Sequence, residues 1–88
     1  MRLIYSTQFK KDYKKIKRQE KDVARLETVV KKLLKKEPLE PKYKDHKLTG
    51  RWKSFRDCNI EPDWILIYQL TDDALILERT SSHSDLFK

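Results

Sequence analysis

The segment that most constrains the fold is the apolar run from Trp64 to Leu70, which reads WILIYQL. It is too short to span a bilayer and has the length of a β-strand. A strand that is apolar at nearly every residue is buried on both faces, so the rest of the chain must cover both sides of a sheet. The chain has 88 residues, the size of one domain. The sequence therefore predicts a single domain, spanning residues 1–88, that contains this strand.

Two amphipathic helices are expected before the apolar run. Phe9, Tyr13 and Ile16 recur at helical spacing after Ser6, a residue type that is favoured at helix N-caps. A second apolar stripe follows, and Pro38 is expected to stop its helix. The residues of this second stripe are Val23, Leu26, Val29, Val30, Leu33 and Leu34.

Three further segments are expected to be strands. Arg2–Tyr5 is long enough only for a strand, residues 52–60 are polar and aromatic like an edge strand, and residues 74–80 begin with four apolar residues. Residues 71–73 are too few for a crossover helix, so the last two strands pair antiparallel. Residues 37–50 hold two prolines and the only glycine and are expected to form a loop. The predicted fold class is α+β, with two helices packed on a small antiparallel sheet in the order β-α-α-β-β-β and a short C-terminal turn.

Positive charge is concentrated in the two predicted helices. Residues 10–36 hold twelve Lys or Arg against four Asp or Glu, and the net charge of the chain is +7. This balance favours a polyanionic partner: nucleic acid first, an acidic protein second and an anionic membrane third. Solvation of the lysines and direct contact with phosphates both remain open as readings of these helices.

Cys58 is the only cysteine, which excludes an internal disulfide. The N-terminal residues do not show the charged start and apolar middle of a signal peptide. A cytoplasmic location is therefore expected.

Two histidines stand out as candidates for acid–base chemistry. His46 and His83 both lie in polar surroundings, KDHKL and SSHSD, and histidine titrates near neutral pH. RNA cleavage needs a base for the 2′-OH, an acid for the departing 5′-oxygen and a cation for the charge that develops on the phosphorus centre; no metal is required. The groups available to support the histidines are Arg56, Arg79, Asp57, Asp63 and Asp85.

Other kinds of site are less well supported. His46, His83, Asp57 and Asp63 are possible metal ligands, but no HxxH or HxxxH pair or cysteine cluster is present. Neither Cys58 nor any serine lies in a nucleophile motif. Phe87 is expected either to cover an open edge of the core or to stack on a base, and both readings stay open.

Three blocks of sequence carry a family resemblance: YKDHKLTGRWKSFRD at 43–57, EPDWILIY at 61–68 and ERTSSHSDLF at 78–87. Together they resemble the YafQ group of toxins, in the RelE/ParE superfamily of type II toxin–antitoxin systems. The resemblance covers nearly the whole chain. It implies an mRNA interferase, an endoribonuclease that cuts mRNA in the ribosomal A site without metal or cofactor. It also implies a cognate antitoxin that binds and silences the enzyme.

The resemblance also assigns roles by position. His46, Asp63 and His83 match the catalytic residues of the family, and Phe87 matches a residue that holds a base. The residues expected to bind RNA or support the transition state are Lys53, Arg56, Asp57, Arg79 and Phe87. Asn59 departs from the pattern, because well-known relatives carry a histidine there. Asparagine forms hydrogen bonds but does not shuttle protons near neutral pH.

Two rival functions follow from the same residues. A ParE-like inhibitor of DNA gyrase keeps the fold, although its relatives lack the set of histidines and acids found here. A non-catalytic RNA-binding module is the second rival, and Asn59 in place of a histidine is its motivation.

Overall fold

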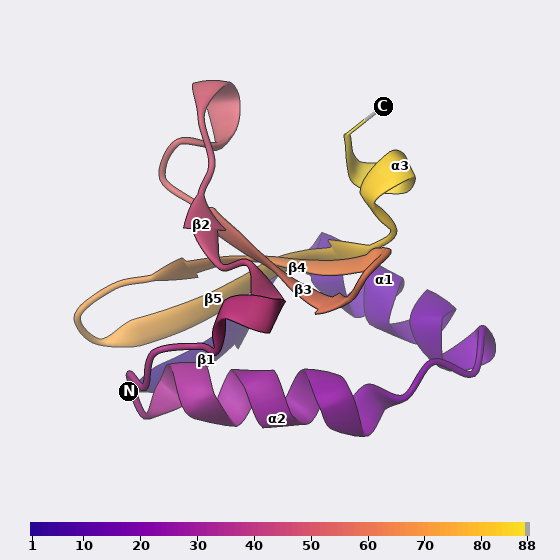
Figure 1. Cartoon of the computed structure of the whole chain (residues 1–88), viewed down its shortest axis with the longest axis horizontal. Coiled ribbons are helices and arrows are strands. Elements are labelled where there is room, and N and C mark those ends of the chain that lie inside the picture. The colour runs from indigo at the N-terminus through magenta and orange to yellow at the C-terminus, as the bar shows by residue number, and fades with distance from the viewer. Residues whose placement is uncertain (88) are drawn as a thin grey trace.

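The computed structural model describes residues 1–87, which form a sheet with two long helices on one face (Figure 1). In chain order the helices and strands are β1 Arg2–Tyr5, α1 Thr7–Arg18, α2 Val23–Leu34, β2 His46–Lys47, β3 Arg56–Glu61, β4 Trp64–Leu70, β5 Ala74–Ser81 and α3 His83–Leu86. Two 3₁₀ turns, η1 at Pro41–Tyr43 and η2 at Gly50–Trp52, flank β2. Within residues 1–87, no helix has the length and apolar character needed to cross a membrane.

The strands of the described chain are ordered β1-β5-β4-β3-β2 in one sheet. The α+β class and the β-α-α-β-β-β order are confirmed, and β3, β4 and β5 form the expected antiparallel meander. The sheet is mixed rather than purely antiparallel, since β1 pairs with β5 in parallel. Parallel neighbours need a long connection, and here both helices and three strands lie between β1 and β5. The apolar pattern of neighbouring residues does not reveal that two strands so distant in sequence pair.

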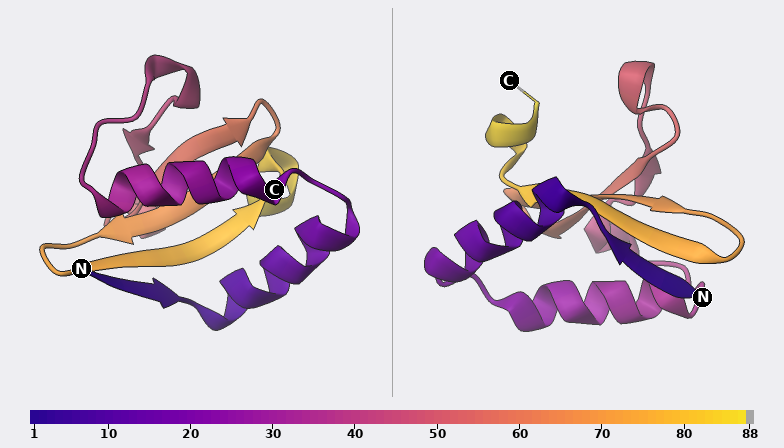
Figure 2. Two further views of the ribbon diagram at one scale, coloured as in Figure 1. Left: turned by 90° about the horizontal axis from the view of Figure 1, so that it is seen from below. Right: turned by 180° about the vertical axis from the view of Figure 1, so that it is seen from behind.

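The two helices form for the reasons that the sequence suggested. The Ser6 hydroxyl accepts a hydrogen bond from Phe9 N at 2.9 Å and so caps α1. Asp22 caps α2 through Ala24 N at 3.2 Å. The predicted stripes face the sheet, with Phe9 and Ile16 of α1 buried, and Figure 2 shows both helices lying across the same face. Helix α2 ends at Leu34, before Pro38, and Lys36 then turns the backbone with φ of 56°.

Strand β4 is buried on both faces, as its composition predicted. Trp64, Leu66 and Tyr68 face the helices and belong to the main core. Ile65 and Ile67 face the other way and form a second cluster with Leu86 of α3. We call Ile65, Ile67, Leu86 and the partly buried side chains around them the open-face cluster. The partly buried members are Leu48, Trp52, Phe55 and Phe87. The open-face cluster brings α3 and the loop around η2 onto the face of the sheet that the long helices leave uncovered.

Two boundaries differ from the sequence-based expectation. Residues 37–50 were expected to be a loop, but His46–Lys47 pairs with β3 as an edge strand. The strand expected at 52–60 begins only at Arg56, because η2 occupies Gly50–Trp52. Gly50 adopts φ of 64°, a conformation that glycine enters without steric cost.

A buried carboxylate ties α1 to β5. Asp12 is 6% exposed on the apolar side of an otherwise basic helix. Its oxygens accept hydrogen bonds from Arg79 Nε at 2.7 Å, Arg79 Nη2 at 3.2 Å and Thr80 N at 3.1 Å. Strand β1 pairs with β5 only as far as Leu77, so no strand binds the backbone amide of Thr80 on that edge. Asp12 accepts the hydrogen bond from this amide instead.

We expect Asp12→Ala to destabilise the protein, because it leaves a guanidinium and a buried amide without partners. The expected loss is about 3 kcal/mol, which lowers Tm by roughly 15 °C in a domain of this size. Thermal unfolding followed by circular dichroism measures the change. Glu37→Ala removes an exposed acid and serves as the matched control, with an expected change within about 0.5 kcal/mol. Equal melting of the two variants would contradict the role of Asp12.

Candidate active site

Four residues form one row across the open face of the sheet. His46 of β2 pairs with Asp57 of β3, Asp57 pairs with Ile67 of β4, and Ile67 pairs with Arg79 of β5. Residues directly opposite one another on neighbouring strands project from the same face. Ile67 belongs to the open-face cluster, so His46 and Asp57 project from the face opposite the long helices. Arg79 has the same register, and its guanidinium contacts Asp12 of α1.

The His46 ring is held in one orientation by its own turn. Its Nδ1 lies 2.7 Å from the carbonyl oxygen of Lys44, which can only accept a hydrogen bond. This contact assigns the neutral-ring proton to Nδ1 and leaves the lone pair on Nε2. The ring is exposed, with Nε2 the nitrogen available as a proton acceptor.

Asp57 is a buried acid beside this ring. It is 4% exposed, and its Oδ1 lies 3.1 Å from His46 Nδ1. The Nδ1 proton points to Lys44, so this contact is electrostatic, and Oδ1 has no hydrogen-bond partner within residues 1–87. Burial raises the pKa of Asp57, while the positive charge that His46 and His83 can carry acts in the opposite direction. Both histidines therefore lie within electrostatic reach of one carboxyl group.

His83 is the first residue of α3, which rises above the end of β5 (Figure 1). Ser82 caps this short helix by accepting a hydrogen bond from Asp85 N. Asp63, in the turn between β3 and β4, accepts a hydrogen bond from the backbone N of His83 at 3.4 Å. Asp63 thus fixes the backbone of His83 rather than its ring. The His83 ring packs on Phe87 with 4.9 Å between centroids.

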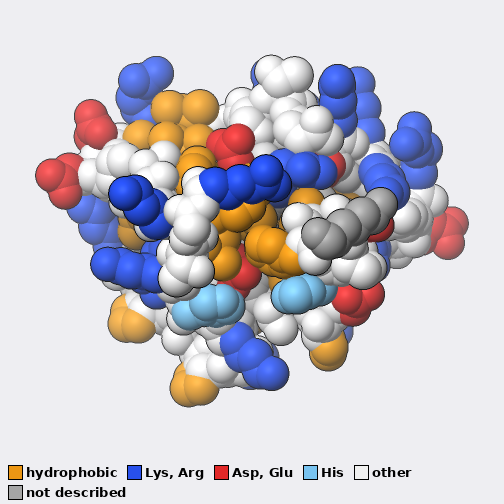
Figure 3. Space-filling model, turned by 90° about the horizontal axis from the view of Figure 1, so that it is seen from above, with side chains coloured by type: hydrophobic (Ala, Val, Ile, Leu, Met, Phe, Trp, Pro, Cys, Tyr) orange, Lys and Arg blue, Asp and Glu red, His pale blue; other side chains and the backbone are white. Residues whose placement is uncertain are grey.

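Both histidines lie on the open face, and Asp63 contacts the backbone of His83. Figure 3 looks onto the open face and shows both histidine rings on it, with hydrophobic and acidic side chains between them. Phe87 is half-buried against the open-face cluster, which supports its role as a cover for the core. Lys53 is exposed directly after η2, which stands above the sheet on the side of β2.

The two arginines differ in their relation to this surface. Arg56 pairs with Tyr68 across the strands, and its Nε donates to Asp45 on the helix side of the sheet. The contact between Arg56 and a phosphate stays a prediction. Arg79 lies in the row of the histidine site and uses Nε and Nη2 to bind Asp12. Its remaining N–H groups are left to bind an anion.

Sequence reasoning missed the residues that hold the site in place. Asp12 supports Arg79, and Asp45 binds Tyr68 and Arg56 directly before His46. Asp12 carried a signal, since it falls between Phe9 and Ile16 on the apolar stripe. Asn59 lies two residues after Asp57 and pairs with Ile65, so it shares the open face.

The buried Asp57 predicts a pH-dependent stability. Because its pKa is raised, the folded protein disfavours the carboxylate, and the wild type carries this cost at pH values above the raised pKa. Below the ordinary pKa of about 3.9, the group is neutral in both folded and unfolded states and the cost is absent. We therefore expect Asp57→Asn to raise Tm at neutral pH, with a gain that shrinks to nothing as the pH falls through this range.

Melting curves measured across that pH series check this expectation. Asp72→Asn, at an exposed turn position, is the control and should leave Tm nearly unchanged at every pH. A gain in Tm for Asp57→Asn that is independent of pH would show that the charge of Asp57 is not its source.

The chain is similar to known proteins over nearly its whole length. The model of the family described as "Bacterial toxin of type II toxin-antitoxin system, YafQ" matches residues 1–88. The mRNA interferase toxin YafQ of Escherichia coli strain K12 is 48% identical over 84 residues, which cover 94% of this chain and 91% of that protein.

Two solved structures show the same fold. A chain of the E. coli DinJ-YafQ toxin-antitoxin complex superposes with a TM-score of 0.91 at 46% identity, covering 98% of this chain and 96% of that one. A metal-bound toxin from Helicobacter pylori superposes with a TM-score of 0.92 at 42% identity, covering 99% of both chains.

Proposed function

The chain belongs to the YafQ family of bacterial toxins of type II toxin–antitoxin systems, and from this premise we propose that it is an mRNA interferase that cuts mRNA in the ribosomal A site. The E. coli relative is named an mRNA interferase toxin, and action in the ribosomal A site is part of the proposal. The observation that carries the proposal is that His46 and His83 share the open face, with the buried Asp57 Oδ1 3.1 Å from His46 Nδ1. The protein would then act in the cytoplasm, where messages are translated.

The two histidines take different roles in this proposal. His46 presents the lone pair of Nε2 and acts as the base that removes the proton from the 2′-OH. The 2′-oxygen attacks the phosphorus, and the bond to the 5′-oxygen breaks. His83, as the imidazolium, gives its proton to that departing oxygen. The Asp57 carboxylate stabilises the positive charge that His46 acquires, and Arg79 offsets the charge on the phosphate.

The proposed reaction needs no metal, and this part requires its own test because an H. pylori relative is metal-bound. Within residues 1–87, no three His, Cys, Asp or Glu side chains converge as metal ligands would. Cleavage should persist when EDTA is in excess over the toxin but below the total magnesium, because EDTA then strips transition metals and leaves the ribosomes their magnesium.

We expect His83→Ala to abolish cleavage of translated messages, because the leaving oxygen loses its acid. A general acid contributes about 10² to 10⁴ in rate, so the cleavage rate should fall by at least about a hundredfold. Primer extension on a message translated in a purified system measures the cuts.

Ser84→Ala is the matched control for this substitution. Ser84 is exposed on the same turn of α3, and its hydroxyl lies 3.3 Å from the Ser82 hydroxyl. Discrete cuts are expected for the wild type and for Ser84→Ala. Intact messages with the wild-type protein would refute the proposed function, and unchanged cutting by His83→Ala would refute the role of His83.

We also propose that the basic faces of the helices bind ribosomal RNA. Many lysines are exposed along α1 and α2: Lys10, Lys11, Lys14, Lys15, Lys17, Lys31 and Lys35. Such contacts release counterions from the nucleic acid, so the affinity for ribosomes should fall steeply as salt is added.

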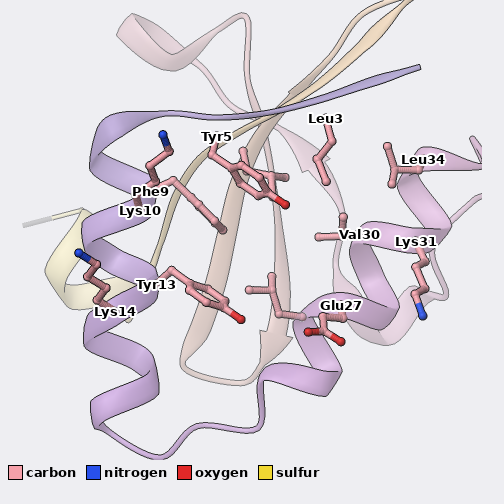
Figure 4. A pocket seen from close by; sticks show the side chains of 12 residues that line it. Leu3, Tyr5, Phe9, Lys10, Tyr13, Lys14, Glu27, Val30, Lys31 and Leu34 are labelled. Carbon is pink, nitrogen blue, oxygen red and sulfur yellow. The ribbon is translucent and has the colours of Figure 1, made fainter.

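We propose that the antitoxin binds this chain on the helix side of the sheet. A groove of about 650 Å³ runs between α1, α2 and β1 (Figure 4). Leu3, Phe9 and Val30 form its apolar floor, and Lys10, Lys14 and Lys31 lie at its rim. An amphipathic segment with acidic edges fits this chemistry. A partner in this groove would cover lysines that the ribosome contact uses, and would inhibit without reaching the histidines.

We expect Tyr5→Ala to weaken the antitoxin at least about tenfold, because a large aromatic side chain is a frequent anchor of binding energy. Tyr5 lines the groove, is 46% exposed and stacks on Phe9 with 5.6 Å between ring centroids, so Tm is measured beside the affinity to confirm that the variant is folded. Calorimetry with the antitoxin encoded beside the toxin gene measures the affinity. Leu70→Ala is the control, since Leu70 is 37% exposed and lies outside the groove. Equal affinities for wild type, Tyr5→Ala and Leu70→Ala would place the antitoxin elsewhere.

A further inference from the structure

We propose that Tyr68, acting through Asp45, is a positioning residue for the His46 ring. Tyr68, Asp45 and Arg56 form what we call the Tyr68 anchor, and Arg56 belongs to this anchor instead of the phosphate site. The inference rests on the function proposed above for His46. It concerns three side chains on the helix side of the sheet that set the geometry of a ring on the open face.

The local structure around His46 is weak by itself. Strand β2 has two residues, both exposed, and it pairs only with Asp57 and Arg56 at the edge of the sheet. The chain enters β2 from η1 through Lys44, whose φ of 50° is a left-handed conformation that non-glycine residues rarely adopt. A two-residue edge strand after such a turn needs an additional tether to hold a catalytic ring in one position.

The side chain of Asp45 provides that tether. Its Oδ1 accepts a hydrogen bond from Tyr68 Oη at 2.5 Å and a second one from Arg56 Nε at 3.3 Å. Tyr68 is 1% exposed in β4, the strand that is buried on both faces. Burial and the Asp45 carboxylate raise the pKa of Tyr68, so its hydroxyl remains a proton donor at any pH at which RNA is handled. The tether thus connects the edge of the sheet to its most buried strand.

Asp45 and His46 are coupled by the geometry of the strand. Successive residues of an extended chain point to opposite faces, so the contact of Asp45 on the helix side presents His46 on the open side. The carbonyl of Lys44, which precedes Asp45, accepts the hydrogen bond from His46 Nδ1 at 2.7 Å. When the tether holds residues 44–46 still, Nδ1 keeps this acceptor and Nε2 faces the solvent as a base.

Loss of the tether has a specific consequence for the ring. Asp57 Oδ1 lies 3.1 Å from the same Nδ1 and has no hydrogen-bond partner of its own within the described chain. If the Lys44 carbonyl moves, the ring can rotate so that Nδ1 donates to Asp57. This rotation redirects Nε2 away from the position that the 2′-OH would occupy.

Tyr68→Phe tests this inference, since it removes the hydroxyl and keeps the buried ring. We expect the cleavage rate on programmed ribosomes to fall about tenfold with little change in KM, a pattern that indicates loss of an interaction made only in the transition state. In a His46→Ala background the same substitution should have no further effect, because the tether acts through that ring. The ¹⁵N chemical shifts of the His46 ring should change in Tyr68→Phe, which reports its altered hydrogen bonding without any activity assay.

Two further variants separate the anchor from a general loss of tyrosine hydroxyls and from phosphate binding. Tyr43→Phe removes a hydroxyl that lies outside the anchor, on a ring flanked by Lys32 and Lys42, so it should leave the cleavage rate and the His46 shifts unchanged. Arg56→Gln should slow cleavage without changing how ribosome affinity depends on salt. A salt slope that falls by about one unit would identify Arg56 as a phosphate contact and overturn its assignment to the anchor.

The outcomes distinguish this inference from the function on which it rests. Unchanged His46 shifts in Tyr68→Phe, or an equal loss of rate with and without His46, would overturn the inference while leaving the enzyme proposal intact. If the wild-type protein does not cut RNA, the proposed function fails, and the ring shifts alone decide whether Tyr68 orients His46.

Discussion

Strand β4 lies in the middle of the sheet and hides its side chains on both faces, so two separate layers have to cover it. The long helices supply one layer. The other consists of α3 and the loop around η2, which pack on Ile65 and Ile67. The positions of the two histidines follow from this packing. His46 begins the strand that leads into the covering loop, and His83 begins α3. The core and the candidate active site are therefore consequences of one packing requirement.

Carboxylates carry most of the long-range organisation around that site. Asp12 holds Arg79, Asp45 holds the turn before His46, and Asp63 holds the backbone of His83. Asp57 differs from these three, because its buried Oδ1 has no hydrogen-bond partner in residues 1–87 and lies beside the His46 ring. Three of the 14 acids of this lysine-rich chain thus lie where segments distant in sequence meet.

The two faces of the sheet divide the proposed functions between them. The open face carries the acid–base residues, and the helix face carries the groove and the exposed lysines. An antitoxin in the groove would then inhibit the toxin by blocking its contact with the ribosome. The Tyr68 anchor crosses between the faces, since a hydroxyl on the helix side sets the ring on the open side.

The sequence by itself determined the local elements and the family. Periodic apolar residues predicted both helices and the apolar run predicted β4, because such patterns depend only on nearby residues. The three blocks indicated the family, and with it His46, Asp63 and His83 as the proposed catalytic residues. Tertiary structure alone decided that β1 joins β5 in parallel and that Arg56 faces Asp45. The tertiary structure also decided from which face of the sheet Arg79 projects. Leu77 pairs with Tyr68 toward the helices, yet Arg79 pairs with Ile67 on the open face, because Glu78 is an extra residue in the ladder that reverses the alternation. A bulge of this kind arises from pairing with a neighbouring strand, and the order of residues within one strand does not encode it.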